Sequence, residues 1–380
     1  MADTLPSQRH LFDIPEGVAY LNCAYFPPMP RPVREAGRRA VEGSASPWNT
    51  GADDFFEPGE RLRESFARLI GGDADGVAFA PSVSYGASVA ARNLPVGPGR
   101  TVVMVEEEFP SDVYPWRDKL AREGGEIVVV PRPPSGPWTD GLLGAIDDRT
   151  AVVVASACHW TDGSAIDLVQ VGEASRSVGA ALVVDLSQSL GAVPFDVAEV
   201  QPDFLVSVGY KWQMGPYAFG YLWASERRRD GSGIEATWAG RKGSDDFNRL
   251  VDYTDELRAG ARRFDAGESA NFILLPMAAA ALDLLHEWQP ERVSASLAPL
   301  TARIEEGARG IGLHPVPAAD RLPHLIGVRF PMGEPSGLRE RLTEGRVFVS
   351  LRANAVRVAP HLYNDEADVD RLLAVLESVL

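Results

Sequence analysis

The chain has 380 residues, and at roughly 100–200 residues per domain this length predicts two or three structural units. Its composition, 45% hydrophobic and 24% charged, is that of an ordinary globular protein. The 53 acidic and 37 basic residues give a net charge of -16. This balance argues against a nucleic acid or an anionic membrane surface as the partner, because both require a basic face. In so acidic a chain, a local cluster of basic side chains would be informative.

Cysteine content and the chain start narrow the class of protein further. Cys23 and Cys158 are the only cysteines, too few for a disulfide framework or a four-cysteine zinc site, and we predict no metal. The first residues lack the basic region and apolar core of a secretory signal. No apolar run approaches the roughly 20 residues of a membrane helix. We therefore expect a cytoplasmic protein.

Seven short apolar segments in the first 225 residues predict β-strands. They are rich in β-branched residues, are bounded by Gly, Pro, Ser or Asp, and lie at residues 77–80, 102–105, 126–130, 151–157, 181–187, 204–209 and 219–225. Helical patterns such as residues 115–125 and 168–179 separate them. This alternation predicts an α/β fold with a mostly parallel seven-stranded sheet covered by helices on both faces. Ligands of such sheets bind at the carboxyl ends of the strands.

The pattern changes after residue 226. A polar, glycine-bearing stretch predicts a loop up to about residue 272, and a long helix follows over residues 272–288. Residues 290–380 mix helices and strands, which predicts a smaller α+β domain. We expect an N-terminal arm (1–25) lying over the large domain, the large domain itself (26–285) and the small domain (286–380).

Two strand ends carry side chains suited to chemistry. Asp185 follows a fully apolar strand, so its carboxylate needs a cation, hydrogen-bond donors or a helix to cap. Gln188 lies three residues further on. Lys211 follows the strand 204–209 and precedes a turn rich in Gly and Pro, beside the hydroxyl of Tyr210. A lysine held in a cleft loses its charge easily and becomes a nucleophile, whereas a lone lysine in a loop is usually solvated.

Two earlier strand ends offer an anion site and an aromatic face. The turn formed by Ser82, Val83 and Ser84 opens a helix, where backbone N–H groups and hydroxyls can bind an anion, or where Ser82 simply caps the helix. Phe109 follows another strand and could stack on a planar ring, or could be a core residue.

Further candidates come from other parts of the chain. Arg352 and Arg357 could each form a bidentate pair of hydrogen bonds with a carboxylate, or lie on the surface. His159 and Thr161 follow the strand 151–157, and His159 is as compatible with a structural role as with a catalytic one. Tyr25 is a further candidate near the substrate, together with Trp116.

These signals together resemble the class V aminotransferase family, enzymes of fold type I that depend on pyridoxal phosphate (PLP). The resemblance runs from YLNCA (20–24) to VRVAPHLYNDEADVDRLL (356–373), and its most specific parts are VVDLSQSLGAVPFDV and SVGYKWQMGPYAFGYL. It implies a Schiff base between PLP and Lys211, with Asp185 on the pyridinium nitrogen, Gln188 on the phenolic oxygen and Phe109 on the ring.

The resemblance also assigns phosphate, substrate and partner contacts. It implies that Ser82, Val83, Ser84, Thr161 and Tyr210 hold the cofactor. Arg352 is implied as the residue that binds the substrate carboxylate, although Arg357 remains open, with Tyr25 and His159 nearby. The segment 263–272 resembles the part that reaches the phosphate of a neighbouring subunit, which implies a homodimer with its active site at the subunit interface.

Two departures limit the choice of reaction. Residues 335–380 contain no cysteine, whereas cysteine desulfurases carry a catalytic cysteine near this region. Gln188 stands where kynureninases usually place His. We expect an aminotransferase acting on an α-amino acid or amine, with a C–S or C–C lyase or an epimerase as the alternative. A nucleotide-binding or non-catalytic α/β protein is a third possibility, suggested by the glycines of residues 231–236.

Overall fold

A computed structural model describes residues 3–134, 136–352 and 355–380. The large domain is built on a seven-stranded sheet in the order β2-β8-β7-β6-β5-β3-β4. Its strands are β2 (Val77–Ala80), β3 (Thr101–Val105), β4 (Glu126–Val130), β5 (Thr150–Ser156), β6 (Ala181–Asp185), β7 (Phe204–Val208) and β8 (Gly220–Ala224). Only β8 runs antiparallel to its neighbours, so the predicted mostly parallel sheet and its seven strands are confirmed.

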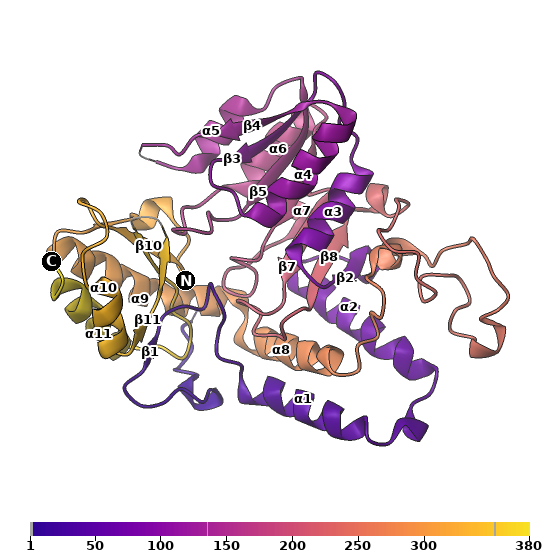
Figure 1. Cartoon of the computed structure of the whole chain (residues 1–380), viewed down its shortest axis with the longest axis horizontal. Coiled ribbons are helices and arrows are strands. Elements are labelled where there is room, and N and C mark those ends of the chain that lie inside the picture. The colour runs from indigo at the N-terminus through magenta and orange to yellow at the C-terminus, as the bar shows by residue number, and fades with distance from the viewer. Residues whose placement is uncertain (1–2, 135, 353–354) are drawn as a thin grey trace.

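Helices cover both faces of this sheet (Figure 1). They are α1 (Arg31–Gly43), α2 (Glu57–Leu69), α3 (Val83–Asn93), α4 (Pro110–Glu123), α5 (Trp138–Ala145), α6 (Leu168–Ser177), α7 (Val197–Val200) and α8 (Leu274–Trp288). Helices α3 and α4 share one core with the sheet, and α2, α5, α6 and α8 share the other. The polar stretch between β8 and α8 forms only short 3-10 turns in an otherwise irregular loop, as predicted.

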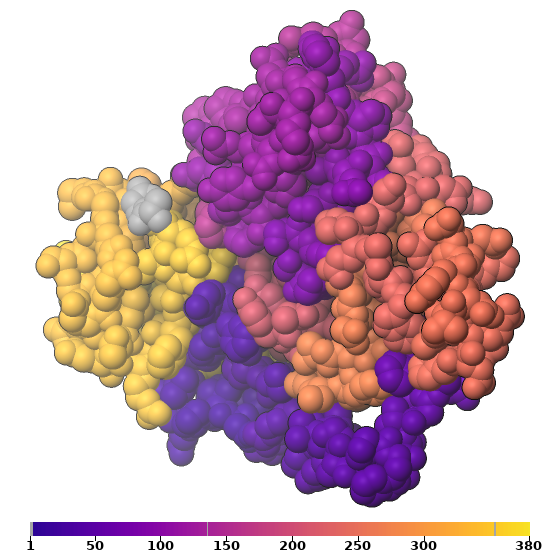
Figure 2. Space-filling view, turned by 45° about the vertical axis from the view of Figure 1, so that its right-hand side comes forward, coloured from indigo at the N-terminus to yellow at the C-terminus, as the bar shows by residue number. Residues whose placement is uncertain are grey.

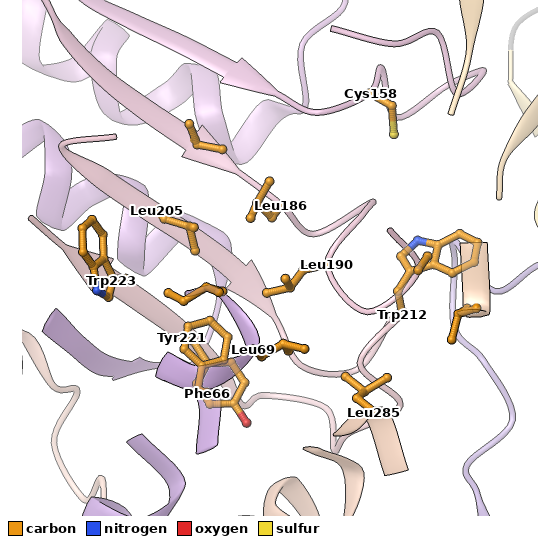
Figure 3. Close-up of a cluster of buried hydrophobic side chains, with 14 of the residues drawn as sticks. Phe66, Leu69, Cys158, Leu186, Leu190, Leu205, Trp212, Tyr221, Trp223 and Leu285 are labelled. Atoms are coloured by element: carbon orange, nitrogen blue, oxygen red, sulfur yellow. The ribbon is translucent and has the colours of Figure 1, made fainter. Parts of the chain in front are cut away.

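Side chains along each strand alternate between the two cores, because successive residues of a strand point to opposite faces. In β6, Leu182 and Val184 pack with α2 and α8, while Ala181 and Val183 pack with α3 and α4. Asp185 continues the second series and therefore points to the face that α3 and α4 cover. Figure 3 shows part of the opposite core, where the rings of Phe66 and Tyr221 stack at 4.0 Å between centroids.

The small domain contains an antiparallel sheet in the order β12-β13-β10-β9. These strands are β9 (His314–Pro315), β10 (Ile326–Arg329), β12 (Ser350–Arg352) and β13 (Ala355–Val358), accompanied by α9 (Pro290–Gly310), α10 (Leu338–Glu344) and α11 (Glu366–Glu377). Figure 2 shows this domain in yellow against the large domain. None of the helices in the described part of the chain combines the length and apolar content needed to span a bilayer.

The N-terminal arm differs from the expectation. Strand β1 (Ala19–Tyr20) pairs in parallel with β11 (Val347–Phe348) of the small domain, and Ala19 and Leu21 belong to the small-domain core. Ala24 then reaches the large domain, where its carbonyl accepts a hydrogen bond from Gln188. The expectation that the arm lies over the large domain is therefore wrong for residues 19–21. The position of the arm depends on pairing between strands that are far apart in the chain. A strand of two residues is also too short to show the alternating pattern by which strands are predicted.

Candidate active site

Lys211 lies in a tight loop between the antiparallel strands β7 and β8. Within the loop, the N–H of Gly215 donates to the carbonyl of Gly209 at 2.8 Å, and the N–H of Gly209 donates to Phe219 at 2.9 Å. A Cβ atom on Gly209 would approach the Phe219 carbonyl to 2.9 Å, so the glycine permits this close approach. The glycine-rich sequence thus folds the chain back and holds the Lys211 side chain inside, only 7% exposed.

The environment of Lys211 favours a neutral amine. Its Nζ lies 5.4 Å from the ring centroid of Phe109 and 5.9 Å from that of Tyr210. Burial lowers the pKa of Lys211 to about 8, an effect that Asp185 opposes and Arg357 adds to. About half of the amine is therefore neutral near pH 8, which makes Lys211 a usable nucleophile and base.

Three buried carboxyl groups gather close to this amine, and we call Glu108, Asp112 and Asp185 the acid cluster. Asp185 accepts a hydrogen bond from the N–H of Ser187 at 2.8 Å. Asp112 is 1% exposed, and neither of its carboxyl oxygens accepts a hydrogen bond from a donor among the described residues. Glu108 uses one oxygen to accept the N–H of Phe109 at 2.7 Å, and its other oxygen has no such partner.

The acid cluster cannot hold three full negative charges in so buried a place. Burial raises the pKa of Asp112 well above its ordinary value, with further contributions from the charges of Asp185 and Glu108 and from a hydrogen bond with Asp185. Burial also raises the pKa of Glu108 to about 7. A protonated Asp112 can donate a hydrogen bond to Asp185.

Glu108 and Asp112 were not among the predicted site residues. The available signal was the sequence EEEFPSD at residues 106–112, which follows the apolar strand β3 and places two acids around Phe109. An acidic run after a strand is usually solvated, so no local pattern predicts that these two side chains are buried.

The Ser82–Ser84 turn opens α3 at the same edge of the sheet as Lys211, since β2 and β7 both run antiparallel to β8. Ser82 caps the helix by accepting the N–H of Tyr85 at 3.2 Å, and the Ser82 and Ser84 hydroxyl oxygens lie 2.9 Å apart. The cap interpretation is thus correct for Ser82. It leaves the hydroxyl of Ser84 and the first N–H groups of α3 able to bind an anion.

Gln188 joins three parts of the site. Its Nε2 donates to the Ala24 carbonyl at 3.0 Å, and its Oε1 accepts the indole N–H of Trp212 at 3.1 Å. The amide thereby fixes the N-terminal arm and the residue next to Lys211. Because an amide nitrogen carries two hydrogens, one N–H still lacks a partner among the described residues. A contact with the cofactor's phenolic oxygen remains a prediction.

His159 and Thr161 belong to a structural network beside the site. His159 is 1% exposed and stacks on Trp138 with the centroids 5.1 Å apart. Its Nε2 donates to the carbonyl of Glu106 at 3.0 Å, so its Nδ1 accepts the hydroxyl of Thr161 at 2.7 Å. Burial lowers the pKa of His159, which keeps the ring neutral. Both ring nitrogens are therefore occupied, while Thr161 also lines a cavity near Lys211.

Arg352 and Arg357 lie near each other on neighbouring strands of the small domain. Arg357 is 1% exposed and donates to the Trp160 carbonyl at 2.8 Å, while its Nε has no partner among the described residues. Burial lowers the pKa of Arg357 to about 9, and Arg352 contributes. Neither arginine pairs with a carboxylate in the described chain. Two such cations side by side define a site for an anion.

The remaining candidates lie at the surface, in the core and in an irregular loop. Tyr25 is 59% exposed and lies close enough to Arg352 to affect its charge. Trp116 is fully buried in the core under α4 and is not among the residues lining the cavity. Residues 231–236 lie in an irregular loop that starts no helix. The dinucleotide interpretation of these glycines is therefore wrong.

The chain matches the family described as "Aminotransferase class-V" over residues 49–372. A similar protein is the uncharacterized aminotransferase YcbU of Bacillus subtilis, 29% identical, with 83% of this chain and 82% of that protein covered. Isopenicillin N epimerase of Amycolatopsis lactamdurans is 25% identical, covering 100% of this chain and 99% of that protein. The solved complex of the cystine C–S lyase C-DES with cysteine persulfide is 18% identical, with a TM-score of 0.86 over 96% of this chain and 98% of that chain.

The chain therefore belongs to the class V aminotransferase family. It is a PLP-dependent enzyme of fold type I. Its relatives are named for different reactions, so the reaction remains open among transamination, lyase chemistry and epimerisation. The site fits this cofactor: a buried amine, an adjacent carboxylate and hydroxyls at a helix start are the groups that an aldehyde, a pyridine nitrogen and a phosphate require. The described residues contain no set of His, Cys, Asp or Glu arranged to hold a metal ion.

Proposed function

We propose that this enzyme acts on an α-amino acid, that Lys211 holds PLP as a Schiff base, and that the reaction is transamination. The observation that carries the proposal is the burial of the Lys211 amine between Phe109 and Tyr210, within reach of the Asp185 charge. A lysine in bulk water would be protonated at neutral pH and could serve neither as nucleophile nor as base.

The chain's own residues divide the work of holding cofactor and substrate. When bound, PLP supplies the electron sink that stabilises a carbanion at the substrate's α-carbon. Asp185 would face the pyridine nitrogen, and Phe109 would lie against the ring. Ser82, Ser84, Tyr210 and the N–H groups at the start of α3 would bind the phosphate. Lys211 Nζ would take the α-proton and return it.

Arg357 is the better candidate than Arg352 for the substrate's α-carboxylate. The structure supports this in two ways: Arg357 is almost fully buried, and its charge acts on Lys211 more strongly than that of Arg352. Its Nε lacks a partner among the described residues, and an α-carboxylate would complete its hydrogen bonds. This choice replaces Arg352, which the sequence resemblance favoured.

A lyase or an epimerase would use the same residues, but one variant of lyase chemistry lacks support. Desulfuration through an enzyme persulfide needs an accessible, reactive thiol. Cys23 and Cys158 are both 0% exposed, and burial raises the pKa of both thiols. Neither cysteine meets this requirement.

We also propose that the enzyme is a homodimer. Its long loop before α8 exposes large apolar side chains, among them Phe247, Leu250, Val251 and Tyr253, and exposed apolar patches of this kind mark interfaces. The adjoining segment 263–272 would then reach the partner's cofactor. Light scattering on the eluting protein should give a mass near twice 41.1 kDa, and a mass of one chain would contradict the proposal.

A visible spectrum tests the role of Lys211. The purified protein loaded with PLP should absorb in the visible range, and Lys211→Ala should lose this band and fall in activity by at least about 1,000-fold. An unchanged band in the variant would remove Lys211 from this role. Product analysis then decides the reaction: a keto acid with the aminated cofactor supports transamination. Pyruvate or alanine with a released fragment indicates a lyase, and an inverted amino acid indicates an epimerase.

A further inference from the structure

A cavity of about 470 Å³ lies at the junction of the two domains. Arg352 in its wall is close enough to Lys211 for its charge to act on that amine. Glu107 and Thr161 line it from the large domain, and Arg329 and Arg352 line it from the small domain. Glu108 also lines it and immediately precedes Phe109, whose ring faces the Lys211 amine. A substrate whose α-carbon lies at Lys211 would therefore extend its side chain into this cavity.

Two arginines at the cavity share a single carboxylate. Arg132 donates to Asp162 Oδ2 at 2.7 Å, and Arg329 donates to the same oxygen at 2.8 Å. Asp162 is 1% exposed and also lines the cavity, where it holds the two guanidinium groups together. One negative charge cannot neutralise two positive ones, and this trio retains a net positive charge.

Arg352 is the third arginine at the cavity, and it has no carboxylate partner in the described chain. Its guanidinium carbon lies 5.5 Å from the ring centroid of Trp160, which also lines the cavity. Its NH1 group donates to the Leu351 carbonyl at 3.0 Å, while its buried Nε has no partner among the described residues. The contact with the ring is a cation–π interaction, and it leaves N–H donors of the guanidinium for an anion.

The acids at the cavity do not cancel this charge. Glu107 approaches Arg132 at 3.3 Å, but its side chain is 56% exposed, so solvent screens it. Glu108 lies buried with one oxygen unpartnered, a position that favours its neutral form. In a chain with a net charge of -16, three arginines around one cavity are a specific arrangement.

We propose that the substrate is an amino acid whose side chain ends in a second anionic group, which Arg352 and Arg329 bind while Arg357 takes the α-carboxylate. The inference rests on the proposed function and deepens it by naming the substrate class. A neutral side chain would leave Arg352 without a partner in a half-buried position, at a cost that a second carboxylate removes.

Acid and amide pairs of the same shape test the proposal. Aspartate is compared with asparagine, glutamate with glutamine, and 2-aminoadipate extends the series by one methylene. We expect at least one acid to exceed its amide in kcat/KM by about 10- to 100-fold, the worth of one or two hydrogen bonds to a charge. As a readout independent of catalysis, glutarate should raise the Tm of the PLP-free protein more than glutaramate does.

Two variants locate the effect. Arg352→Gln and Arg329→Gln should each reduce the acid-to-amide ratio about tenfold, and both should weaken the Tm shift caused by glutarate. Arg339→Gln is the matched control, since Arg339 pairs with Glu334 on the surface of the small domain, away from the cavity. It should change neither the ratio nor the Tm shift.

The outcomes separate this inference from the proposed function. Equal use of acid and amide, rejection of both, or an unchanged ratio in Arg352→Gln would overturn the inference. So would an equal loss for both substrates, because that pattern would assign Arg352 to the α-carboxylate. In each of these cases the visible band that depends on Lys211 would still stand, whereas loss of that band from the wild type would overturn the proposed function instead.

Discussion

The two sides of the site carry opposite charge. On the large domain, Asp185 and Asp112 of the acid cluster act on the Lys211 amine, and Glu108 lies close to both of them. On the small domain, Arg329, Arg352 and Arg357 approach the same space, and among the described residues neither Arg352 nor Arg357 has a carboxylate partner. The acidic side suits a cationic pyridine ring, and the basic side suits an anionic substrate.

This difference shows how one chain can separate cofactor binding from substrate choice. The acidic side is assembled from strand ends and one helix of the large domain, which the parallel sheet positions together. The basic side comes mainly from strands of the second domain, so its arginines can change without disturbing the sheet. The following predictions test each side separately.

The largest effect should come from neutralising the acidic side. Asp185→Asn keeps the shape but removes the charge, and we expect kcat/KM to fall about 100- to 1,000-fold. Burial lowers the pKa of Lys211 to about 8 and Asp185 opposes this shift, so the variant should have a still lower Lys211 pKa. The rate of PLP uptake by the PLP-free protein, followed against pH, should have its midpoint near pH 8 in the wild type and at lower pH in the variant. An unchanged midpoint would argue against contact between the two groups.

Arg357→Gln should damage the basic side without changing its selectivity. Because Arg357 is assigned to the α-carboxylate, which every amino acid carries, KM should rise about 10- to 100-fold for acid and amide substrates alike. Steady-state kinetics with both members of a pair measure this directly. If KM rises only for the acid substrate, Arg357 binds the side-chain anion and Arg352 binds the α-carboxylate.

Asp112→Asn should stabilise the PLP-free protein as pH rises. Burial raises the folded-state pKa of Asp112, so its contribution to stability is complete below its ordinary pKa of 3.8 and is lost as pH rises through the folded-state value. Replacing it with an amide removes this loss, and we expect a gain of about 1–3 kcal/mol at pH 8 and little gain at pH 4. Urea unfolding at both pH values gives the measurement.

The control for this prediction is Asp148→Asn, an exposed carboxyl on the surface of the large domain. It should leave the unfolding free energy nearly unchanged at both pH values. An equal gain in Asp112→Asn at pH 4 and pH 8 would show that the pKa of Asp112 is the same in the folded and the unfolded protein. That result would contradict its burial beside Asp185.

The smallest effect on activity should come from removing both thiols. Cys23 and Cys158 are buried in the core next to the site, and buried thiols of this kind are inert. The double variant Cys23→Ala, Cys158→Ala should keep its product and rate within about twofold while losing about 1–2 kcal/mol of stability through the cavities left behind. If the variant loses activity while circular dichroism shows that it is fully folded, one of the thiols takes part in the mechanism.

Much of the large domain could be predicted because its signals are local. The seven apolar segments each end within two residues of the strands found, since a buried parallel strand is a short apolar run bounded by turn residues. Strand ends also identified Lys211 and Asp185, because the carboxyl edge of such a sheet is where ligands bind. The glycines around Lys211 indicated the tight loop that the structure contains.

The sequence alone determined the sheet, the family and the strand-end positions of Lys211 and Asp185, to which we assign the chemistry, because apolar periodicity and strand-end position are properties of neighbouring residues. Only the tertiary structure decided that Asp112 is buried against Asp185 and that the arm joins the small domain. It also decided that Arg132, Arg329 and Arg352 line one cavity, with Arg357 near Arg352. These contacts join segments that are far apart in the chain, such as Ala19 and Val347, and no local pattern records which of them will meet.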